Sequence, residues 1–223
     1  VPADSLRAVL EAGQAASSSS FMQIVNLIRV TDPAIRAQIR PICAAGGKGG
    51  QVYVETAPEF IVFCADTTRY AHFAPDAQLD WTEVLLIGAV DVGIFAQNVL
   101  LAAESIGLGG VFIGSIRNDL ARVGELLDCP QGVVPIVGLC LGYPDQEPMK
   151  RERLPLDVIL SENRFQAASA ADLQAYNDNV QAYYRTRDGV AQMDWAQQIR
   201  NQFCHEVRPD LLRYLQAQGF AKR

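Results

Sequence analysis

Apolar and polar positions along the first part of the chain alternate between helical and strand-like spacing. Apolar residues recur every three to four positions over 5–16, which predicts a helix. Four serines, 17–20, end it, because serine tends to bond nearby backbone in turns. A β-rich run predicts a strand over 21–30, and Asp32-Pro33 suits the start of a helix that runs to about residue 44.

The middle of the chain predicts buried strands beside one long helix. The continuous apolar run 59–66 predicts a strand covered on both faces. The run 133–142 predicts another, whose start is pushed toward a sheet edge by Pro135. A long helix is expected over 81–106. Its apolar stretch is interrupted by polar residues such as Asp91, so we expect a buried helix of a soluble core, not a membrane span.

The remaining segments are predicted to be helices and loops. Residues 118–127 predict a helix with Asn118 as its N-cap, and the glycine- and proline-rich stretches 46–51 and 144–155 predict loops. Three further helices are expected over 171–187, 195–204 and 209–218. Strands that alternate with helices, followed by an all-helical last third, indicate an α+β or α/β fold with one sheet and helices packed on it.

Composition indicates a globular protein with ample material for a core. The 223 residues, 49% of them hydrophobic, fit one large domain or a core with an extension. A net charge of −6, with no basic run that contains aromatics, argues against nucleic-acid binding. Five scattered cysteines without a C-x-x-C pair, and no secretory leader, predict a reduced, cytoplasmic setting. Two distant histidines, His72 and His205, argue against a His/Cys metal site.

Familiar catalytic motifs are missing or incomplete. The chain has no G-x-S-x-G nucleophile motif, and two histidines offer little for general-base chemistry. The loop GGKGGQ lacks the G-K-[ST] ending of a phosphate loop, and GLGGVF lacks the third glycine of a dinucleotide fingerprint. A hydrolase and a nucleotide-loop protein are therefore both disfavoured.

Four polar or glycine-rich segments remain as candidates for binding. They are the serine run 17–20, Gln51 on its glycine loop, the corner Gly114-Ser115 after a short predicted strand (110–113), and Arg151-Glu152-Arg153. The corner lets a ligand approach main-chain N–H groups closely, although a plain helix–strand–turn link has the same pattern. The two arginines can fork onto one phosphate or form a solvated charged loop. Such elements, without a good nucleophile or base, fit a redox enzyme whose cofactor carries the chemistry.

Longer stretches of the chain resemble a known family. They are ASSSSFMQ (16–23), RVTD (29–32), EFIVFCAD (59–66), LLAAESIGLGGVFIGSIRN (100–118), GLCLGYPDQ (138–146) and RLP (153–155). In this order, along a similarity that runs from residue 1 to the final GFAKR, they resemble the oxygen-insensitive NAD(P)H nitroreductases of the NADPH–flavin oxidoreductase type.

The resemblance implies an α+β, nitroreductase-like fold with a central, mostly antiparallel sheet of four to five strands packed by helices. It implies an FMN-binding core over 1–155 and a helical C-terminal extension over 156–223 with dimer and nucleotide contacts. The protein would be an intertwined homodimer with FMN at the interface. In the implied ping-pong reaction, NADPH, and also NADH, gives a hydride to flavin N5, and a nitroaromatic, quinone or free flavin then takes two electrons. Neither a nucleic acid nor a membrane is an expected partner.

Matching motifs carry the family's binding roles to particular residues. For non-covalent FMN, the resemblance implies Ser18, Ser19, Gln51, the main chain of Phe112, Ile113, Gly114 and Ser115, and the phosphate-binding Arg151 and Arg153. For substrate or NADPH it implies Ser20, Phe21, Arg187 and Arg208. No side chain is expected to be catalytic by itself, because the chemistry belongs to the flavin, and no metal is expected.

The chain departs from the family's pattern at three places. The family's His-Arg-Ser-x-Arg motif, which holds the FMN phosphate, lies upstream of Ser5 and is absent, so we expect that a head precedes Val1. Glu152 interrupts the family's Lys-Pro-Arg and adds a negative charge. The loop 187–193 keeps Arg187 as its basic residue, which predicts a kcat/KM ratio of NADPH over NADH below about 100. The alternative is a flavin-poor, dimeric binding or structural relative whose phosphate site is incomplete.

Overall fold

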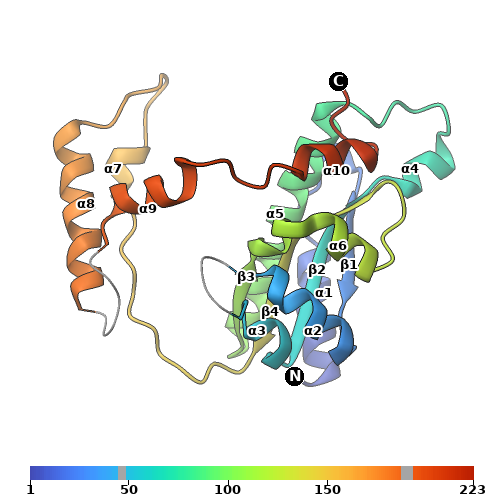
Figure 1. Ribbon diagram of the computed structural model, residues 1–223, viewed down its shortest axis with the longest axis horizontal. Helices are drawn as coiled ribbons and strands as arrows, with labels where there is room; N and C mark the ends of the chain where they lie inside the picture. Colours follow the sequence, from blue (N-terminus) through green and yellow to red (C-terminus); the bar gives the residue numbers. More distant parts are fainter. Residues whose placement is uncertain (45–48, 187–192) are drawn as a thin grey trace. The chain divides into compact units, whose positions relative to one another are not determined.

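The computed structural model describes residues 1–44, 49–186 and 193–223 (Figure 1). The chain forms two compact units. One consists of Val1–Asp145 together with Arg208–Arg223, and the other of Gln146–Val207.

The division between the units differs from the one expected from the sequence. The sequence predicted a single boundary after residue 155. By compactness, the boundary falls after Asp145, and the last residues belong to the first unit. They do so because helix α10 (Leu211–Ala217) packs against helix α6 (Leu120–Leu126) and buries Leu215 in a core cluster with Leu120.

The first unit is built around one four-stranded sheet. Its strands are β1 (Val25–Arg29), β2 (Glu59–Asp66), β3 (Gly109–Ile113) and β4 (Val133–Gly142), in the spatial order β1-β2-β4-β3. Every neighbouring pair is antiparallel. The expected α+β fold with an antiparallel sheet is therefore confirmed, and β1 and β3 form its two edges.

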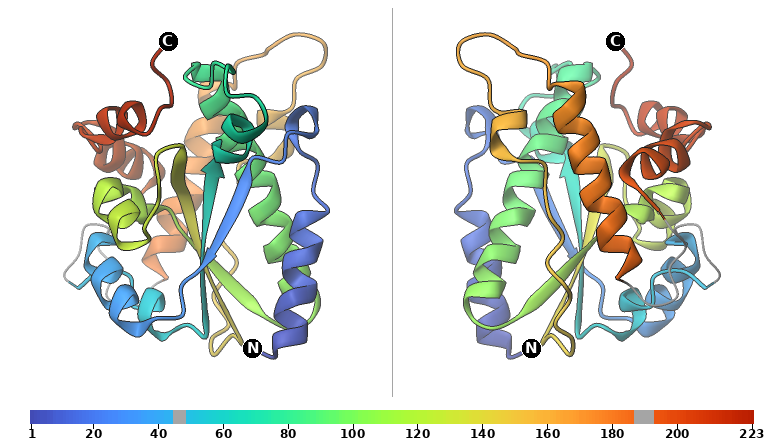
Figure 2. Two further views of the ribbon diagram at one scale, coloured as in Figure 1. Left: turned by 90° about the vertical axis from the view of Figure 1, so that its right-hand side faces the viewer. Right: turned by 90° about the vertical axis from the view of Figure 1, so that its left-hand side faces the viewer.

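Helices cover both faces of this sheet (Figure 2). On one face lie α1 (Ala3–Gln14) and α5 (Thr82–Ser105), and on the other α2 (Pro33–Ile42), α3 (Tyr53–Thr56) and α6. Shorter elements join them: the 3₁₀ turns η1 (Ser19–Phe21) and η2 (Gly114–Asp119), and helix α4 (Thr68–Phe73). The second unit holds α7 (Leu156–Ile159), α8 (Ala170–Arg185) and α9 (Trp195–Phe203). The short helices α3, α4 and α7 were not predicted.

Strand β2 explains how one sheet supports two cores. All of its residues are buried, as its unbroken apolar run predicted. Phe60, Val62 and Cys64 pack in the cluster with α2, α3 and α6. Ile61 and Phe63 pack in the cluster with α1 and α5. Because successive side chains of a strand point to opposite faces, the single apolar run supplies both clusters.

The expectation that Pro135 marks a sheet edge is wrong, because β4 lies between β2 and β3. Proline is tolerated in this central strand at a β-bulge. The register shifts between Phe63 and Cys64 of β2, which pair with Val137 and Pro135, so Ile136 has no partner in β2. The missing proline N–H therefore falls where the ladder is already interrupted.

Two other local expectations are corrected, and one is confirmed. The strand predicted over 21–30 begins only at Val25, because the residues before it form a turn. The N-cap of α6 is Asp119, not Asn118: its side chain accepts a hydrogen bond from the Arg122 N–H at 3.0 Å. The predicted cap Asp32 of α2 is confirmed by its bond from the Ala34 N–H at 2.7 Å.

Helix α5 is buried along only one side. Its inner face, including Val92, Ala96 and Val99, packs on the sheet and α1. A second stripe is apolar and exposed: Leu86, Val90, Ile94 and Leu101. Among the described residues, α5 is also the one helix whose length and composition would suffice to cross a membrane. The expectation of a buried helix therefore holds for half of its circumference.

Candidate functional site

The serine run forms a tight turn that leads into the edge strand β1. It is closed by hydrogen bonds from the Phe21 and Met22 N–H groups to the Ser18 and Ser19 carbonyls. Ser20, Phe21 and Gln23 have φ angles of 48°, 59° and 53°, which residues with a side chain rarely adopt. Strained backbone of this kind gathers at ligand-binding positions.

Some side chains of this serine turn anchor it to the rest of the core unit, and others are exposed to solvent. The backbone N–H and the hydroxyl of Ser19 both donate to the Asp91 carboxylate on α5, at 3.0 and 2.7 Å. The Ser18 hydroxyl accepts from the Gln23 N–H at 2.8 Å, which leaves its proton for another acceptor. The Phe21 ring is 80% exposed. Of the predicted residues here, Ser19 is thus the anchor, while Ser18, Ser20 and Phe21 face outward.

A groove of about 690 Å³ opens beside the serine turn, between α1 and β1. Its walls come from α1, the turn and β1, and Asp91 and Phe95 of α5 contribute to its lining. The lining combines basic side chains (Arg7, Arg29 and Arg69) with acidic ones (Asp4, Glu11 and Asp91). The turn therefore borders a groove that carries charged side chains of both signs.

The predicted glycine corner lies at the exit of β3, where the chain enters η2. Its first N–H groups, those of Gly114 and Ser115, begin a 3₁₀ turn that no side chain caps, and so have no partner within that turn. The Ser115 hydroxyl donates to the Cys43 carbonyl at 3.3 Å, and the Asn118 amide donates to the carbonyls of Ile42 and Ala44. These contacts fasten the corner to the C-terminal end of α2.

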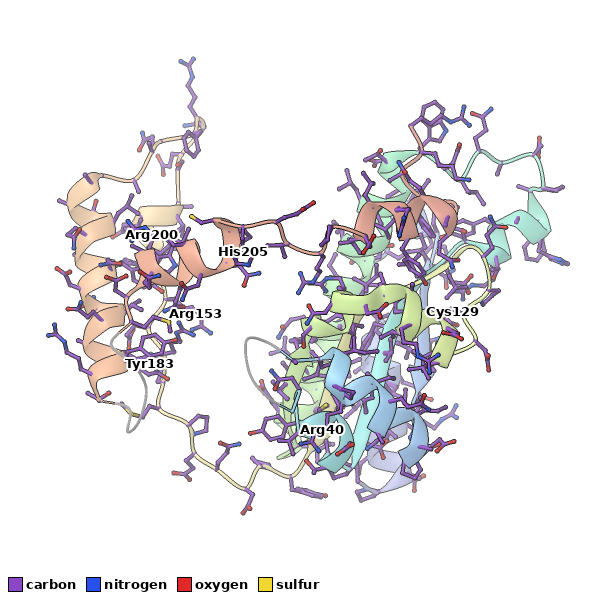
Figure 3. The ribbon with its side chains drawn as sticks, in the orientation of Figure 1. Arg40, Cys129, Arg153, Tyr183, Arg200 and His205 are labelled. Carbon is purple, nitrogen blue, oxygen red and sulfur yellow. The ribbon has the colours of Figure 1, made fainter. Side chains whose placement is uncertain are left out.

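The loop that carries Gln51 is also fastened to α2. Arg40 of α2 donates from Nε to the Gly49 carbonyl at 2.8 Å and forms an ion pair with Glu55 (Figure 3). Gly50 has a φ of 72°, and a Cβ there would lie 1.9 Å from the Arg40 carbonyl oxygen, so glycine is required. The structure thus places Gln51 and the glycine corner on the same helix end.

Two arginines lie on or beside η2, the turn that begins with the glycine corner. Arg117 donates from Nη1 to the carbonyl of the bulged Ile136 at 2.6 Å, and its Nη2 is 3.3 Å from where a Cβ on Gly114 would be. Arg208, with a φ of 53°, donates from Nε to the Asn118 side chain at 3.2 Å. Burial and the charge of Arg208 together lower the pKa of Arg117. Both line a cavity of about 220 Å³, whose lining also holds the acidic residues Asp119 and Asp210.

Arg208 was expected from the sequence, but Arg117 and Asp91 were not. Arg117 lies three residues after Gly114, in SIRN. The one feature of the sequence that could have singled it out is its position close to the small-residue corner. Asp91 is a lone acid in an apolar helix. The sequence marked it as an interruption of a membrane-like stretch, which was the signal for its role.

The serine turn and the glycine corner lie at opposite edges of the sheet. The turn precedes β1 and the corner follows β3, with β2 and β4 between them. Three strand spacings of about 4.8 Å separate the edge strands by about 14 Å. They also lie on different faces, since the turn is anchored to α5 and the corner to α2. One chain thus presents two separate halves of a site.

The remaining predicted arginines lie in the second unit. There Arg151 stacks over the Tyr184 ring at 5.3 Å and donates to the Gln198 side chain at 2.6 Å. Arg153, labelled in Figure 3, donates to the Arg151 carbonyl at 2.9 Å. The expected NADPH-binding Arg187 lies outside the described residues.

Metal chemistry finds no support in the part of the chain that the structure describes. No group of three His, Cys, Asp or Glu side chains is arranged to hold an ion there. The cysteines are free thiols, and burial raises the pKa of Cys43 to about 11 and that of Cys140 to about 12. Such thiols behave as small apolar side chains, as expected for Cys140 from its strand.

Family models match nearly the whole chain. The nitroreductase family matches residues 1–143, and the C-terminal domain of that family matches residues 151–223. The chain is 47% identical to the NADPH-flavin oxidoreductase of Vibrio harveyi, over 96% of this chain and 88% of that protein. It is 44% identical to the oxygen-insensitive NADPH nitroreductase of Salmonella typhimurium, over 97% of this chain and 88% of that protein.

Solved structures agree with this relationship. Nitroreductase A from Vibrio parahaemolyticus superposes with a TM-score of 0.93 and 47% identity, covering 100% of this chain and 91% of that one. The NADPH:FMN oxidoreductase from Vibrio harveyi, in complex with NAD⁺, gives a TM-score of 0.91 at 45% identity, with the same coverage. The chain therefore belongs to the nitroreductase family.

Proposed function

We propose that this chain is an FMN-dependent NAD(P)H oxidoreductase that acts as a homodimer and reduces nitroaromatics, quinones or free flavin by two electrons. The observation that carries the proposal is the glycine corner, where Arg117 lies beside Gly114, the first N–H groups of η2 have no partner within that turn, and Arg208 bonds to Asn118 farther along η2. Such donors suit a planar ring that gains negative charge on reduction. The names of the Vibrio harveyi and Salmonella typhimurium relatives, a flavin oxidoreductase and a nitroreductase that use NADPH, support the same chemistry.

The residues at the glycine corner offer the types of hydrogen-bond donor that FMN would require. The amides of Gly114 and Ser115 and the side chain of Gln51 offer donors on one helix end, and a Cβ at Gly114 would crowd Arg117. When bound, FMN supplies the redox chemistry, because it accepts a hydride from the nicotinamide and returns two electrons to an acceptor. The neighbouring main-chain groups of Phe112 and Ile113 would complete this wall.

Each of the chain's own groups has a definite task in this proposal. The fixed charges of Arg117 and Arg208 stabilise negative charge at the corner, and Arg208 also suits a nitro group or the nicotinamide nucleotide. From the serine turn, the Ser18 hydroxyl would donate its proton to the ring system, and the Ser19 hydroxyl, whose proton goes to Asp91, would serve as an acceptor. Ser20 and the exposed Phe21 cover the open side and exclude water from it.

We assign the FMN phosphate to Arg151 and Arg153. Arg151 is preorganised, because its stacking on Tyr184 and its bond to Gln198 hold the guanidinium group on α8 and α9. Arg187 is kept as a prediction for the nucleotide phosphate. The backbone carbonyl of Glu152 accepts a hydrogen bond from the Tyr176 hydroxyl at 3.3 Å, which helps to hold the segment 151–153 against α8.

The two separated half-sites support a homodimer. The edge strands that carry the turn and the corner are about 14 Å apart, and the two features lie on different faces, so we assign their contacts with one ring to different copies. A two-fold axis would bring the serine turn of one copy to the glycine corner of the other, and so complete two equal sites. The exposed apolar face of α5 offers the contact surface for this pairing.

The decisive experiment is reconstitution of the purified full chain with FMN. We expect yellow protein with absorption near 450 nm that NADPH bleaches anaerobically, and whose colour returns on addition of nitrofurazone, menadione or FMN. Competition among these three acceptors ranks them by kcat/KM. Colourless protein that does not bind FMN would overturn the proposal and favour the flavin-poor dimer, the alternative left open by the sequence.

A further inference from the structure

A buried carboxylate lies in the middle of the apolar helix α5. Asp91 is 1% exposed, and its helix is otherwise almost wholly apolar along this stretch. An isolated charge in such a place is strongly unfavourable unless hydrogen bonds compensate it. Compensation comes from one residue, since the Ser19 N–H lies 3.0 Å from each carboxylate oxygen and the Ser19 hydroxyl lies 2.7 Å from Oδ1.

The residue that Asp91 holds begins the strained part of the serine turn. Ser20, Phe21 and Gln23, with their positive φ angles, follow directly. On the other side of the turn, the Tyr70 hydroxyl of α4 donates to the Met22 carbonyl at 2.8 Å. A backbone in this conformation persists only where its surroundings fix it. Among the described residues, Asp91 and Tyr70 clamp the turn, and Asp91 accepts three hydrogen bonds whereas Tyr70 donates one.

Asp91 also belongs to the helix that carries the exposed apolar face. Its sequence neighbour Val90 and, three residues on, Ile94 lie on that face. A movement of α5 is therefore transmitted to Ser19 through three hydrogen bonds, and from there to the exposed ring of Phe21. A buried acid with a purely structural role would be expected to stabilise packed residues. Asp91 instead holds a strained segment whose aromatic ring is exposed to solvent.

We infer that Asp91 is a positioning residue that locks the serine turn onto α5 and so fixes where Ser20 and Phe21 stand over the open face of the flavin. The statement that the turn faces the flavin rests on the proposed function. The hydrogen bonds between Asp91 and Ser19 do not depend on it. Loss of the clamp releases the turn, so substrates bind over a less ordered wall. The contacts proposed between the glycine corner and the flavin are left in place.

The test compares Asp91→Asn, Asp91→Ala and Ser19→Ala in the full-length protein loaded with FMN. Asparagine keeps one acceptor oxygen, so the three variants remove the clamp in steps. We expect amide exchange of residues 19–23 to become about 10-fold faster or more in Asp91→Ala, with Asp91→Asn intermediate. For menadione, kcat/KM should fall by about 10-fold or more in Asp91→Ala, mainly through a higher KM.

Glu59→Gln is the matched control. Glu59 is another buried acid, 3% exposed, held by two bonds from Arg29 at 2.7 and 2.8 Å. It lies at the opposite end of the β1–β2 pair from the serine turn. We expect this variant to lower the thermal midpoint as Asp91→Asn does, while exchange at 19–23 and the KM for menadione stay within about two-fold of the unchanged protein.

The double variant Asp91→Ala with Ser19→Ala completes the cycle. If the two residues act through their shared bonds, amide exchange of residues 19–23 is no faster in the double variant than in Asp91→Ala alone. Fully additive increases in exchange, or a KM for menadione in Asp91→Ala no higher than that of Glu59→Gln, would overturn the inference. Failure of the proposed function gives a different result: the unchanged protein would bind no FMN, while the exchange experiment would still report whether Asp91 holds the turn.

Discussion

Replacing Val90 by glutamate is expected to separate the proposed homodimer into monomers. Val90 is 54% exposed, near the middle of the apolar face that Leu86, Ile94 and Leu101 continue along α5. In a two-fold dimer every substitution acts twice, once from each copy. A charge here therefore opposes association from both sides of the interface.

The size of the effect follows from burial. Covering a half-exposed valine, leucine or isoleucine contributes about 1 kcal/mol, half of what full burial gives. Four such side chains from each of two copies contribute about 8 kcal/mol before the cost of association. Val90→Glu removes about 2 kcal/mol of this and adds at least about 2 kcal/mol for two poorly solvated carboxylates. The dimer Kd should then rise by about 1000-fold.

Sedimentation equilibrium over a range of protein concentrations measures this Kd. Leu212→Glu is the matched control, because Leu212 on α10 is equally exposed, at 56%, but lies outside the α5 face. We expect Leu212→Glu to remain dimeric with FMN bound and Val90→Glu to be monomeric with weakened FMN binding. A Val90→Glu protein that dimerises like the unchanged chain would refute the assignment of α5 as the interface.

Three further predictions concern stability. Gly110→Ala should lower the free energy of unfolding by about 1–3 kcal/mol in urea titrations, since its Cβ would lie 2.7 Å from a leucine of α5; a loss below about 0.5 kcal/mol contradicts this. Asp32→Ala should cost about 1 kcal/mol by removing the α2 cap, and a variant as stable as the parent would exclude the cap as a contributor. Because burial raises the pKa of Cys43 to about 11 and of Cys140 to about 12, the unfolded chain loses these thiol protons first. The free energy of unfolding should stay constant below pH 9.0 and fall as pH rises through 11. A free energy of unfolding that does not change over this pH range would contradict the assignment.

Local chemistry of the chain predicted most secondary structure. The run 59–66 became β2 without change, and the apolar stretch after Trp81 became α5 to within a residue at each end. These predictions succeeded because strand and helix periodicity are properties of neighbouring residues. Pro135 failed as an edge marker because a bulge, which depends on the register with β2, absorbed its missing N–H.

For the site, motif reasoning found the turn, the corner and Arg208 but not the groups that hold them. Asp91 and Ser19 are 72 positions apart in the chain, and Arg208 and Asn118 are 90 apart. No local pattern links such positions. The sequence marked Asp91 only as a polar interruption, and its three hydrogen bonds are visible only in the folded chain.

By itself, the sequence determined the long helices, the strands other than the start of β1, and which strand feeds two cores, because side-chain spacing dictates these directly. Only the tertiary structure decided that the serine turn and the glycine corner stand at opposite edges of the sheet. It also decided that a carboxylate inside an apolar helix clamps the turn, that Arg117 lies against the corner, and that Arg208 bonds to Asn118. The physical reason is that strand order and side-chain pairing arise from contacts between distant segments, whose relative positions no local periodicity specifies.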